Sequence, residues 1–154
     1  MLLLVTSNAH KAQQIQAALG RSVQQIDLPL PELQAIDVKI VIEHKARAAY
    51  HQVGRPVLVE DTSLAIHAWN GLPGALIRWF LDAVGSKGIC TMLAGHEQLT
   101  AIAETGIGYC HGDVLLSFCG VTQGQVIRWN LTNKTGNGAT RVLRPRGARI
   151  LSGT

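Results

Sequence analysis

The sequence has few cysteines and no long apolar run. Three of its 154 residues are cysteine, and Cys90, Cys110 and Cys119 form no C-x-x-C pair. An odd number of scattered thiols does not suit a disulfide framework or a zinc site, and it fits a reducing compartment. No apolar run approaches the roughly 20 residues of a membrane-spanning helix, and the opening MLLLV is shorter than the apolar core of a signal peptide. We therefore expect a cytoplasmic protein without a membrane segment.

The best-known short catalytic signatures are also absent. The sequence has no G-x-x-x-x-G-K-[ST] phosphate loop, its six histidines form no H-E-x-x-H pair, and no serine or cysteine lies in a G-x-S-x-G setting. It has no internal repeat, low-complexity segment or linker either. With 47% hydrophobic and 16% charged residues, the composition is that of a globular protein. We expect residues 1–154 to form a single domain.

The basic surplus is confined to the end of the chain. The formal net charge is +4, and residues 1–138 carry equal numbers of acidic and basic side chains. The surplus consists of Arg141, Arg144, Arg146 and Arg149. A short arginine tail can bind a polyanion, but such tails are more often solvated. We therefore expect a basic tail at residues 139–154, and nucleic acid is not expected as a partner.

Apolar periodicity predicts strands and helices in alternation, followed by a run of strands. The expected elements are strands at 2–5, 23–28 and 56–60, helices from about 12 to Gly20, from 37 to 53 and from 75 to 84, and two or three strands within 100–131. Turns are expected at 70–74, at 111–113 and at 123–124, and Gly85 is expected to end the third helix. This order favours an α/β fold with a central mixed β-sheet flanked by helices.

The stretch TSNAHK, directly after the first expected strand, has the chemistry of a phosphate site. Lys11 falls in the first turn of a helix, where the helix dipole disfavours a cation unless an anion is also present. The hydroxyls of Thr6 and Ser7, the N–H groups after Asn8 and the Lys11 ammonium could together hold a polyphosphate. The alternative is an ordinary Ser/Asn helix cap with an exposed lysine.

Lys45 lies on the apolar side of the second expected helix. Counting about 100° per residue from Val38 places Lys45 at about 340°, between Val41 at about 300° and Ile42 at about 40°. Such a lysine either extends its ammonium to the rim of the core or directs it into a cleft beside the sheet. The sequence leaves both outcomes open.

Carboxylates follow two of the expected strands. Glu32 lies in the loop after the second strand, and the pair Glu60-Asp61 ends the third. One or two carboxylates, together with phosphate oxygens and water, commonly hold Mg²⁺. Strand alternation sends Glu60 and Asp61 to opposite faces, so only one is expected to join Glu32. The alternative is a solvated acidic turn. Trp69, Trp79 and Trp129 are expected in the core rather than as platforms for a nucleobase.

Two stretches together resemble the inosine triphosphate pyrophosphatase family, also called the Ham1-like or non-canonical purine NTP pyrophosphatases. They are TSNAHK and the long segment VLVEDTSLAIHAWNGLPGALIRWFL at 57–81. In that family an early T-x-x-x-x-K binds triphosphate, and D-[ST]-x-L followed by G-x-P-G supplies a metal-binding acid. The resemblance covers roughly residues 1–131. It implies a Ham1/ITPase-like sheet of the Maf/Ham1 type, an anticodon-like α/β architecture, which here is shortened at its C-terminus.

The resemblance also implies roles for individual residues. Asp61 and Lys11 are expected to be catalytic, and Glu32 and Asp61 are expected to bind Mg²⁺. The expected substrate contacts are Thr6, Ser7, Asn8, Ala9, His10, Lys11, Lys45, Asp61, Thr62 and Arg78.

The resemblance weakens towards the C-terminus. The family continues with G-F-G-[WY]-D-P-x-F-x-P-x-G and a later S-H-R that recognises the purine. The segment GNGATRVLRPRG at 136–147 keeps two glycines and the P-x-G, but Ala139 and Thr140 replace the aromatic residue and the aspartate, and no S-H-R follows. An aromatic base platform is worth about 1–3 kcal/mol, so the base-binding half is expected to differ from that of the family.

The implied activity is a Mg²⁺-dependent nucleoside triphosphate pyrophosphatase that converts ITP, dITP or XTP to the monophosphate and pyrophosphate. The alternative is a relative of that family that binds nucleotides or a protein partner with impaired catalysis. The family commonly dimerises, so a homodimer is expected.

Overall fold

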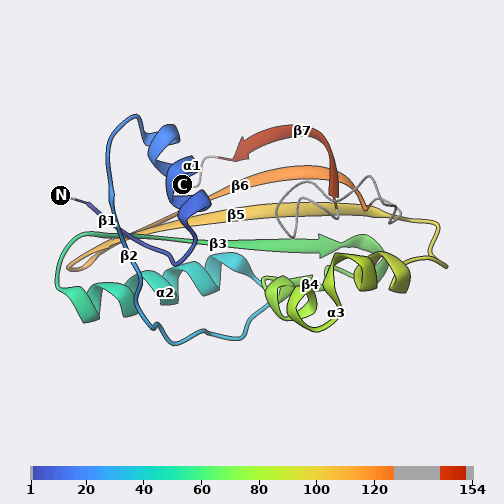
Figure 1. Cartoon of the computed structure of the whole chain (residues 1–154), viewed down its shortest axis with the longest axis horizontal. Helices are drawn as coiled ribbons and strands as arrows, with labels where there is room; N and C mark the ends of the chain where they lie inside the picture. The colour runs from blue at the N-terminus through green and yellow to red at the C-terminus, as the bar shows by residue number, and fades with distance from the viewer. Residues whose placement is uncertain (1, 127–142, 152–154) are drawn as a thin grey trace.

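A long mixed sheet forms the centre of the molecule (Figure 1). The structure is a computed structural model that describes residues 2–126 and the backbone of residues 143–151. The elements of these residues are β1 (Leu3–Val5), α1 (Ala9–Leu19), β2 (Gln24–Ile26), α2 (Val38–Val53), β3 (Val57–Ile66), the 3-10 helix η1 (His67–Trp69), β4 (Pro73–Gly74), α3 (Ile77–Met92), β5 (Thr100–His111), β6 (Val114–Val126) and β7 (Leu143–Leu151).

The sheet has the strand order β2-β1-β3-β5-β6-β7, with β4 paired to β3. β1 is parallel to both β2 and β3, whereas β3, β5, β6 and β7 pair antiparallel. Because a parallel pair needs a crossover, α1 lies between β1 and β2 in the chain and α2 lies between β2 and β3. The expected α/β architecture with a mixed sheet is therefore confirmed.

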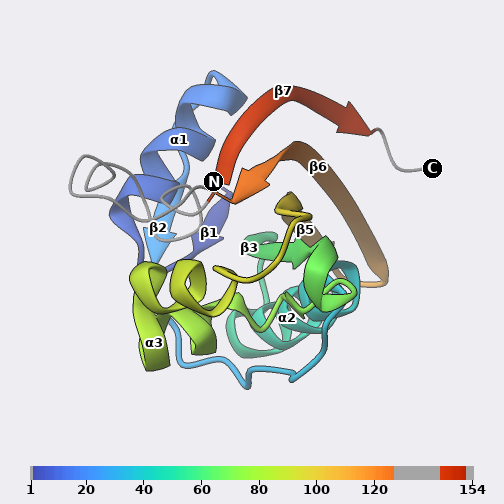
Figure 2. The same cartoon turned by 90° about the vertical axis from the view of Figure 1, so that its right-hand side faces the viewer.

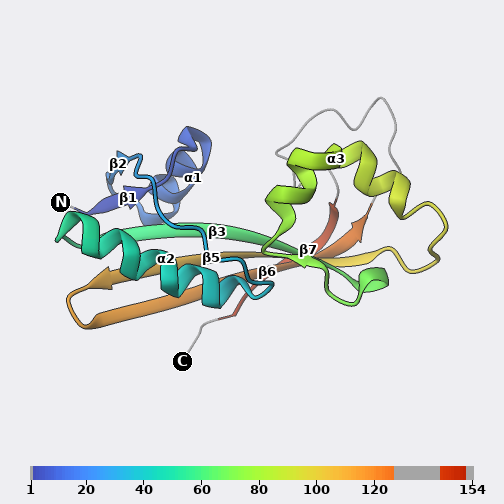
Figure 3. The ribbon, with the colours of Figure 1, turned by 90° about the horizontal axis from the view of Figure 1, so that it is seen from below.

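Helices cover both faces of the sheet. Alternating side chains of β1 and β3 pack against α2 on one face, and those between them pack against α1 on the other. Figure 2 shows α1 and α2 on opposite sides of the sheet, and Figure 3 shows α3 towards the end of the sheet away from β1. α2 approaches β5 closely because Gly106 and Gly108 leave room for Ile42. This close packing fixes the position of α2 over the middle of the sheet.

The C-terminal ends of the first two helices agree with the sequence prediction, and α1 begins at Ala9, before the predicted start near residue 12. Asn8 caps the N-terminus of α1 and Gly20 follows its last residue, while Asp37 and Gly54 occupy the same positions on α2. None of the helices in the described ranges is long and apolar enough to cross a membrane. All three cysteines are free thiols.

The third predicted strand was wrong in its extent. β3 does not end at Glu60 but continues to Ile66, because Asp61, Thr62 and Ser63 keep pairing with Gly106, Thr105 and Glu104 of β5. Glu60 and Asp61 therefore lie in the middle of a strand, and the alternative of a solvated acidic turn is ruled out. β2 is shorter than the predicted 23–28, since it pairs only with the three residues of β1.

Two predicted turns had different outcomes. The turn at 111–113 is confirmed as the hairpin between β5 and β6. The turn at 123–124 was wrong, because both residues lie within β6, where the pairing with β7 shifts register between Thr122 and Gly124. Gly85 has φ 66° and ψ 176°, so it interrupts α3 as predicted, but helical residues resume and continue to Met92.

The predicted basic tail contains a strand in its middle. Leu143–Leu151 forms β7, which satisfies backbone groups along one edge of β6. Residues 139–142 and 152–154 lie outside the described residues, and with them the positions of Ala139 and Thr140.

Candidate active site

A cleft of about 570 Å³ opens beside the end of β1. Its walls come from the β1–α1 turn, the loop between β2 and α2, the middle of β3 and the start of α3. Segments that are distant in the sequence therefore meet at one place. Most of the residues that were predicted to form a site line this cleft: Thr6, Ser7, Asn8, Lys11, Glu32, Lys45, Asp61, Thr62 and Arg78.

The cleft exists because β1 is much shorter than β3. β1 ends at Val5, opposite Val59, and β4 pairs with β3 only from Leu64 onwards. Among the strands that the structure describes, none therefore pairs with Glu60 or Asp61 on that side. Their side chains point to opposite faces, as alternation predicts, yet both line the same cleft because the cleft wraps around this open edge.

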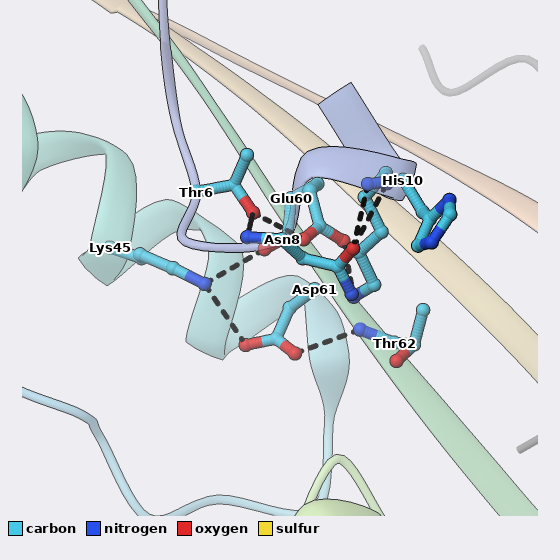
Figure 4. Close-up of polar contacts among 8 residues, drawn as sticks. Thr6, Asn8, His10, Lys45, Glu60, Asp61 and Thr62 are labelled. Atoms are coloured by element: carbon cyan, nitrogen blue, oxygen red, sulfur yellow. Dashed lines mark hydrogen bonds and ion pairs between the residues drawn. The ribbon is translucent and has the colours of Figure 1, made fainter. Parts of the chain in front are cut away.

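The turn after β1 is held by its own side chains. The Thr6 hydroxyl accepts a hydrogen bond from the N–H of Asn8 at 3.1 Å, and the Asn8 side-chain oxygen accepts from the N–H groups of His10 and Lys11 at 3.0 and 3.2 Å (Figure 4). Gln25 of β2 donates to the Thr6 carbonyl oxygen at 3.0 Å. Asn8 is thus a helix cap, as in the alternative, but Lys11 is not the exposed lysine of that alternative. An anion at this turn would have to replace the Asn8 side chain or use the hydroxyls and the Lys11 ammonium.

Lys11 is paired with Glu60. Its ammonium lies 2.7 Å from Oε2 of Glu60, and the Thr6 hydroxyl donates to Oε1 of the same carboxylate at 3.4 Å. The Glu60 residue is 5% exposed, whereas the Lys11 side chain is 26% exposed. A carboxylate therefore supplies the anion that Lys11 needs beside the helix dipole, so the position of Lys11 does not by itself require a phosphate.

Lys45 reaches from α2 into the cleft. Its ammonium donates to the carbonyl oxygen of Glu60 at 2.8 Å and lies 3.5 Å from Oδ2 of Asp61 (Figure 4). The other oxygen of Asp61 accepts a hydrogen bond from the N–H of Thr62 at 2.8 Å. These contacts fix the orientation of the Asp61 carboxylate, and they decide between the two outcomes for Lys45 in favour of the cleft.

A third pair joins the loop before α2 to the start of α3. Nη1 of Arg78 lies 2.8 Å from Oε1 of Glu32, and its Nε lies 3.8 Å from Asp82. Gly74 allows these segments to meet: it has φ 60°, and a Cβ there would lie 2.5 Å from the carbonyl oxygen of Ile36. The neighbouring Ala75 N–H donates to that same oxygen at 2.8 Å. The glycine at the end of GLPG thus has a definite packing role.

Two residues predicted as substrate contacts lie outside the cleft lining, and one expectation about the core was wrong. Ala9 and His10 are exposed on the first turn of α1 and do not line the cleft. Trp79 was expected in the core but is 50% exposed and lines the cleft at the start of α3. Trp69 packs against a core cluster with its ring centroid 6.0 Å from that of Phe80, and Trp129 lies outside the described residues.

Some cleft residues were not found from the sequence. Asp82 lines the cleft and lies one helical turn after Arg78, a spacing of four residues that is itself a recognisable signal for an ion pair. Thr105 also lines the cleft but comes from β5, and no local pattern in the sequence connects it to the other residues.

The donor chemistry of the cleft fits a hard divalent cation that is shared with a substrate. The side chains of Glu32 and Asp61 are 51% and 31% exposed, so their carboxylate oxygens are accessible. No group of three or more His, Cys, Asp or Glu side chains able to hold a metal is found within the described residues. Two carboxylates without further protein ligands are typical of Mg²⁺ sites that are completed by substrate phosphates and water.

Comparison with known proteins gives the family. A profile of the Ham1 family matches residues 2–145. The chain belongs to the Ham1 family. Inosine triphosphate pyrophosphatase of Tuber melanosporum is 40% identical over 131 residues, which are 82% of this chain and 71% of the relative. The dITP/XTP pyrophosphatase of Methanopyrus kandleri is 36% identical over 129 residues, which are 81% of this chain and 69% of the relative.

Solved structures of Ham1 proteins share the fold. The HAM1 protein of Coxiella burnetii superposes with a TM-score of 0.78 at 23% identity, covering 92% of this chain and 80% of that one. A nucleoside-triphosphatase (dITP/XTP pyrophosphatase) of Mycobacterium abscessus gives a TM-score of 0.74 at 20% identity, covering 99% of this chain and 87% of that one. The Ham1/ITPase-like architecture predicted from the sequence is confirmed.

Proposed function

We propose that this Ham1 protein is a nucleoside triphosphate pyrophosphatase that hydrolyses non-canonical purine nucleotides such as ITP, dITP and XTP to the monophosphate and pyrophosphate. The observation that supports this proposal is the single cleft that gathers three cations, Lys11, Lys45 and Arg78, with the carboxylates of Glu32 and Asp61. The relatives named above are inosine triphosphate and dITP/XTP pyrophosphatases.

The three cations suit a triphosphate because they approach from separate elements. Lys11 comes from α1, Lys45 from α2 and Arg78 from α3, and all three line the cleft. Fixed cations around a phosphate chain orient it and stabilise the negative charge that develops on the leaving pyrophosphate. In this proposal the Ser7 hydroxyl contacts phosphate oxygens, with Thr6, Asn8, Ala9 and His10 forming the turn and Thr62 beside Asp61.

Magnesium is the proposed cofactor, held by Glu32 and Asp61. When bound, it neutralises phosphate charge and acidifies water. Asp61 is the proposed general base, since its carboxylate is accessible in the cleft and its direction is fixed by Lys45 and the Thr62 N–H. Lys11 acts on the phosphates as the second catalytic residue.

The direct test is pyrophosphate release from ITP in the presence of Mg²⁺. We expect activity in the unmodified protein and a loss of about 10²–10⁴-fold in Asp61→Asn, the range for removal of a general acid or base. Asp113→Asn is the matched control, because Asp113 lies in the exposed hairpin turn between β5 and β6. Equal rates in the wild type and Asp61→Asn would contradict the proposal, and tight binding of ITP without turnover would support a catalytically impaired relative instead.

We also propose that the protein acts as a homodimer in the cytoplasm. The support for a dimer is an exposed apolar row on β6, formed by Val114, Leu116 and Phe118. Sedimentation velocity of the wild type and of a variant with lysines in this row tests the dimer.

A further inference from the structure

Glu60 is the only charged residue that is buried in the part of the chain with described side chains, residues 2–126. Acidic side chains are almost never buried unless they are paired, because removing a carboxylate from water is costly. Glu60 also lies immediately next to Asp61, the proposed general base, but points to the opposite face of β3. We therefore expect Glu60 to have a role different from that of Asp61.

The contacts of Glu60 reach both lysines of the cleft. Its carboxylate accepts from the Lys11 ammonium at 2.7 Å, and its backbone carbonyl accepts from the Lys45 ammonium at 2.8 Å. The first lysine approaches from the α1 face of the sheet and the second from the α2 face. One residue of β3 is thus the common anchor for two cations from two different helices.

The position of Glu60 decides where the Lys11 ammonium lies. A lysine side chain has a flexible stem of four methylene groups, and without a partner its ammonium extends into water. An ammonium has three donors, and the bond to Glu60 uses one of them, which leaves two for a ligand in the cleft. The open edge of β3 beyond Val5 places this ammonium at the cleft wall rather than inside the sheet.

We propose that Glu60 is a positioning residue that holds the Lys11 ammonium at the wall of the cleft, ready to receive phosphate oxygens. This inference rests on the proposed function, because it assigns Lys11 to the phosphate chain of the substrate. Glu60 itself does not touch the substrate and acts through Lys11. The alternative role, in which Glu60 competes with phosphate for Lys11, predicts the opposite effect of its removal.

A double-mutant cycle tests the assignment. Glu60→Gln keeps the size of the side chain and removes its charge, and we expect kcat/KM for ITP with Mg²⁺ to fall about 10-fold, by analogy with the lower range for groups that orient metal ligands. In the Lys11→Ala background the same substitution is expected to have no further effect. Additive losses would show that Glu60 does not act through Lys11 and would overturn the proposal.

A binding measurement separates this inference from the proposed activity. Calorimetry with pyrophosphate alone, in the absence of metal, is expected to give a dissociation constant about 10-fold higher for Glu60→Gln than for the wild type. If the wild type binds pyrophosphate in this way but hydrolyses no ITP, the proposed function fails and the role of Glu60 remains. Unchanged or tighter binding by Glu60→Gln would overturn the inference.

Two further variants keep the test decisive. Glu43→Gln is the matched control, since the Glu43 carboxylate accepts from Ser117 at 2.9 Å away from the cleft lining, and its pyrophosphate affinity should equal that of the wild type. If Glu60→Gln does not fold, Glu60→Asp keeps the charge but withdraws the carboxylate from Lys11 by one methylene. We then expect a smaller fall in pyrophosphate affinity than for Glu60→Gln. An affinity equal to that of the wild type would overturn the proposal.

Discussion

At the scale of single residues, each cation of the cleft is paired with a carboxylate from another part of the chain, but the three pairs differ in exposure. Arg78 and Glu32 are 70% and 51% exposed, so solvent screens their attraction, and such pairs contribute only about 0–1 kcal/mol to stability. Glu60 is buried beneath Lys11. Glu32 can therefore be released to a ligand at little cost, whereas the Lys11–Glu60 pair persists.

The three thiols are shifted towards their neutral forms. Burial raises the pKa of Cys90 and Cys110, and a nearby Arg47 opposes this for Cys110. Burial is the largest cause that raises the pKa of Cys119 to about 11, and the hydrogen bond to Glu104 and its negative charge also raise it. A thiolate is the reactive form of cysteine, so these residues are expected to be inert near neutral pH.

This shift predicts the pH dependence of labelling at Cys119. With a pKa of about 11, only on the order of one thiol in a thousand is ionised at pH 8, far fewer than for a free cysteine with a pKa near 8.5. We expect slow reaction with iodoacetamide at pH 8 and a rate that rises with pH, measured by mass spectrometry of the Cys119 peptide. Glu104→Gln removes a charge that raises the pKa and should speed labelling at pH 8. Equal rates in both proteins would contradict the assignment to Glu104.

The chemical types of the site residues could be predicted from the sequence, but their pairing could not. The apolar stripe of its helix left open whether the Lys45 ammonium reaches the rim of the core or the cleft, and only its contacts with Glu60 and Asp61 decide this. The Lys11–Glu60 pair joins residues 49 positions apart, and it forms only because β1 ends one residue before the level of Glu60. Trp79 was misassigned because average burial of tryptophan says nothing about which side of α3 faces the cleft.

At the scale of the elements, strand lengths decide where the site can form. The sequence predicted β1 and α2 closely, since apolar runs and helix caps are local signals. It ended β3 too early, because two carboxylates and two hydroxyls resemble a turn, and only pairing with β5 shows that the strand continues. Non-local hydrogen bonds override local propensity here.

The packing of α2 on β5 predicts that a larger residue at Gly108 lowers the stability of the fold. A Cβ there would lie 2.7 Å from Cγ2 of Ile42, 3.0 Å from Cγ2 of Val59 and 3.1 Å from the Ile42 carbonyl oxygen. Gly108→Ala must therefore push α2 away from the sheet, at a cost of roughly 1–3 kcal/mol. Because α2 carries Lys45, we also expect weaker pyrophosphate binding.

Thermal and chemical denaturation measure the stability change, and calorimetry measures the binding. Gly120→Ala is the control, since an added Cβ at this position of β6 meets nothing within 4 Å among the described residues. Equal stability of the two variants would show that α2 can shift without cost.

At the scale of the whole molecule, one edge of the sheet is only partly covered. β7 pairs with β6 from Cys119 to Val126, so the stretch from Val114 to Phe118 has no strand partner on that side within the described residues. Val114, Leu116 and Phe118 are 51%, 47% and 48% exposed there. An open strand edge beside a row of apolar side chains favours association with another chain.

A homodimer predicts a specific response when this edge is charged. We expect the wild type to sediment as a dimer of 16.5 kDa chains and the double variant Leu116→Lys/Phe118→Lys to sediment as a monomer, because two lysines at the edge repel each other and oppose strand pairing. Val84→Lys is the matched control, since Val84 is also an exposed apolar residue, at 44%, but lies on α3. A wild type that stays monomeric as its concentration rises would contradict the dimer, and a double variant that stays dimeric would exclude β6 as the interface.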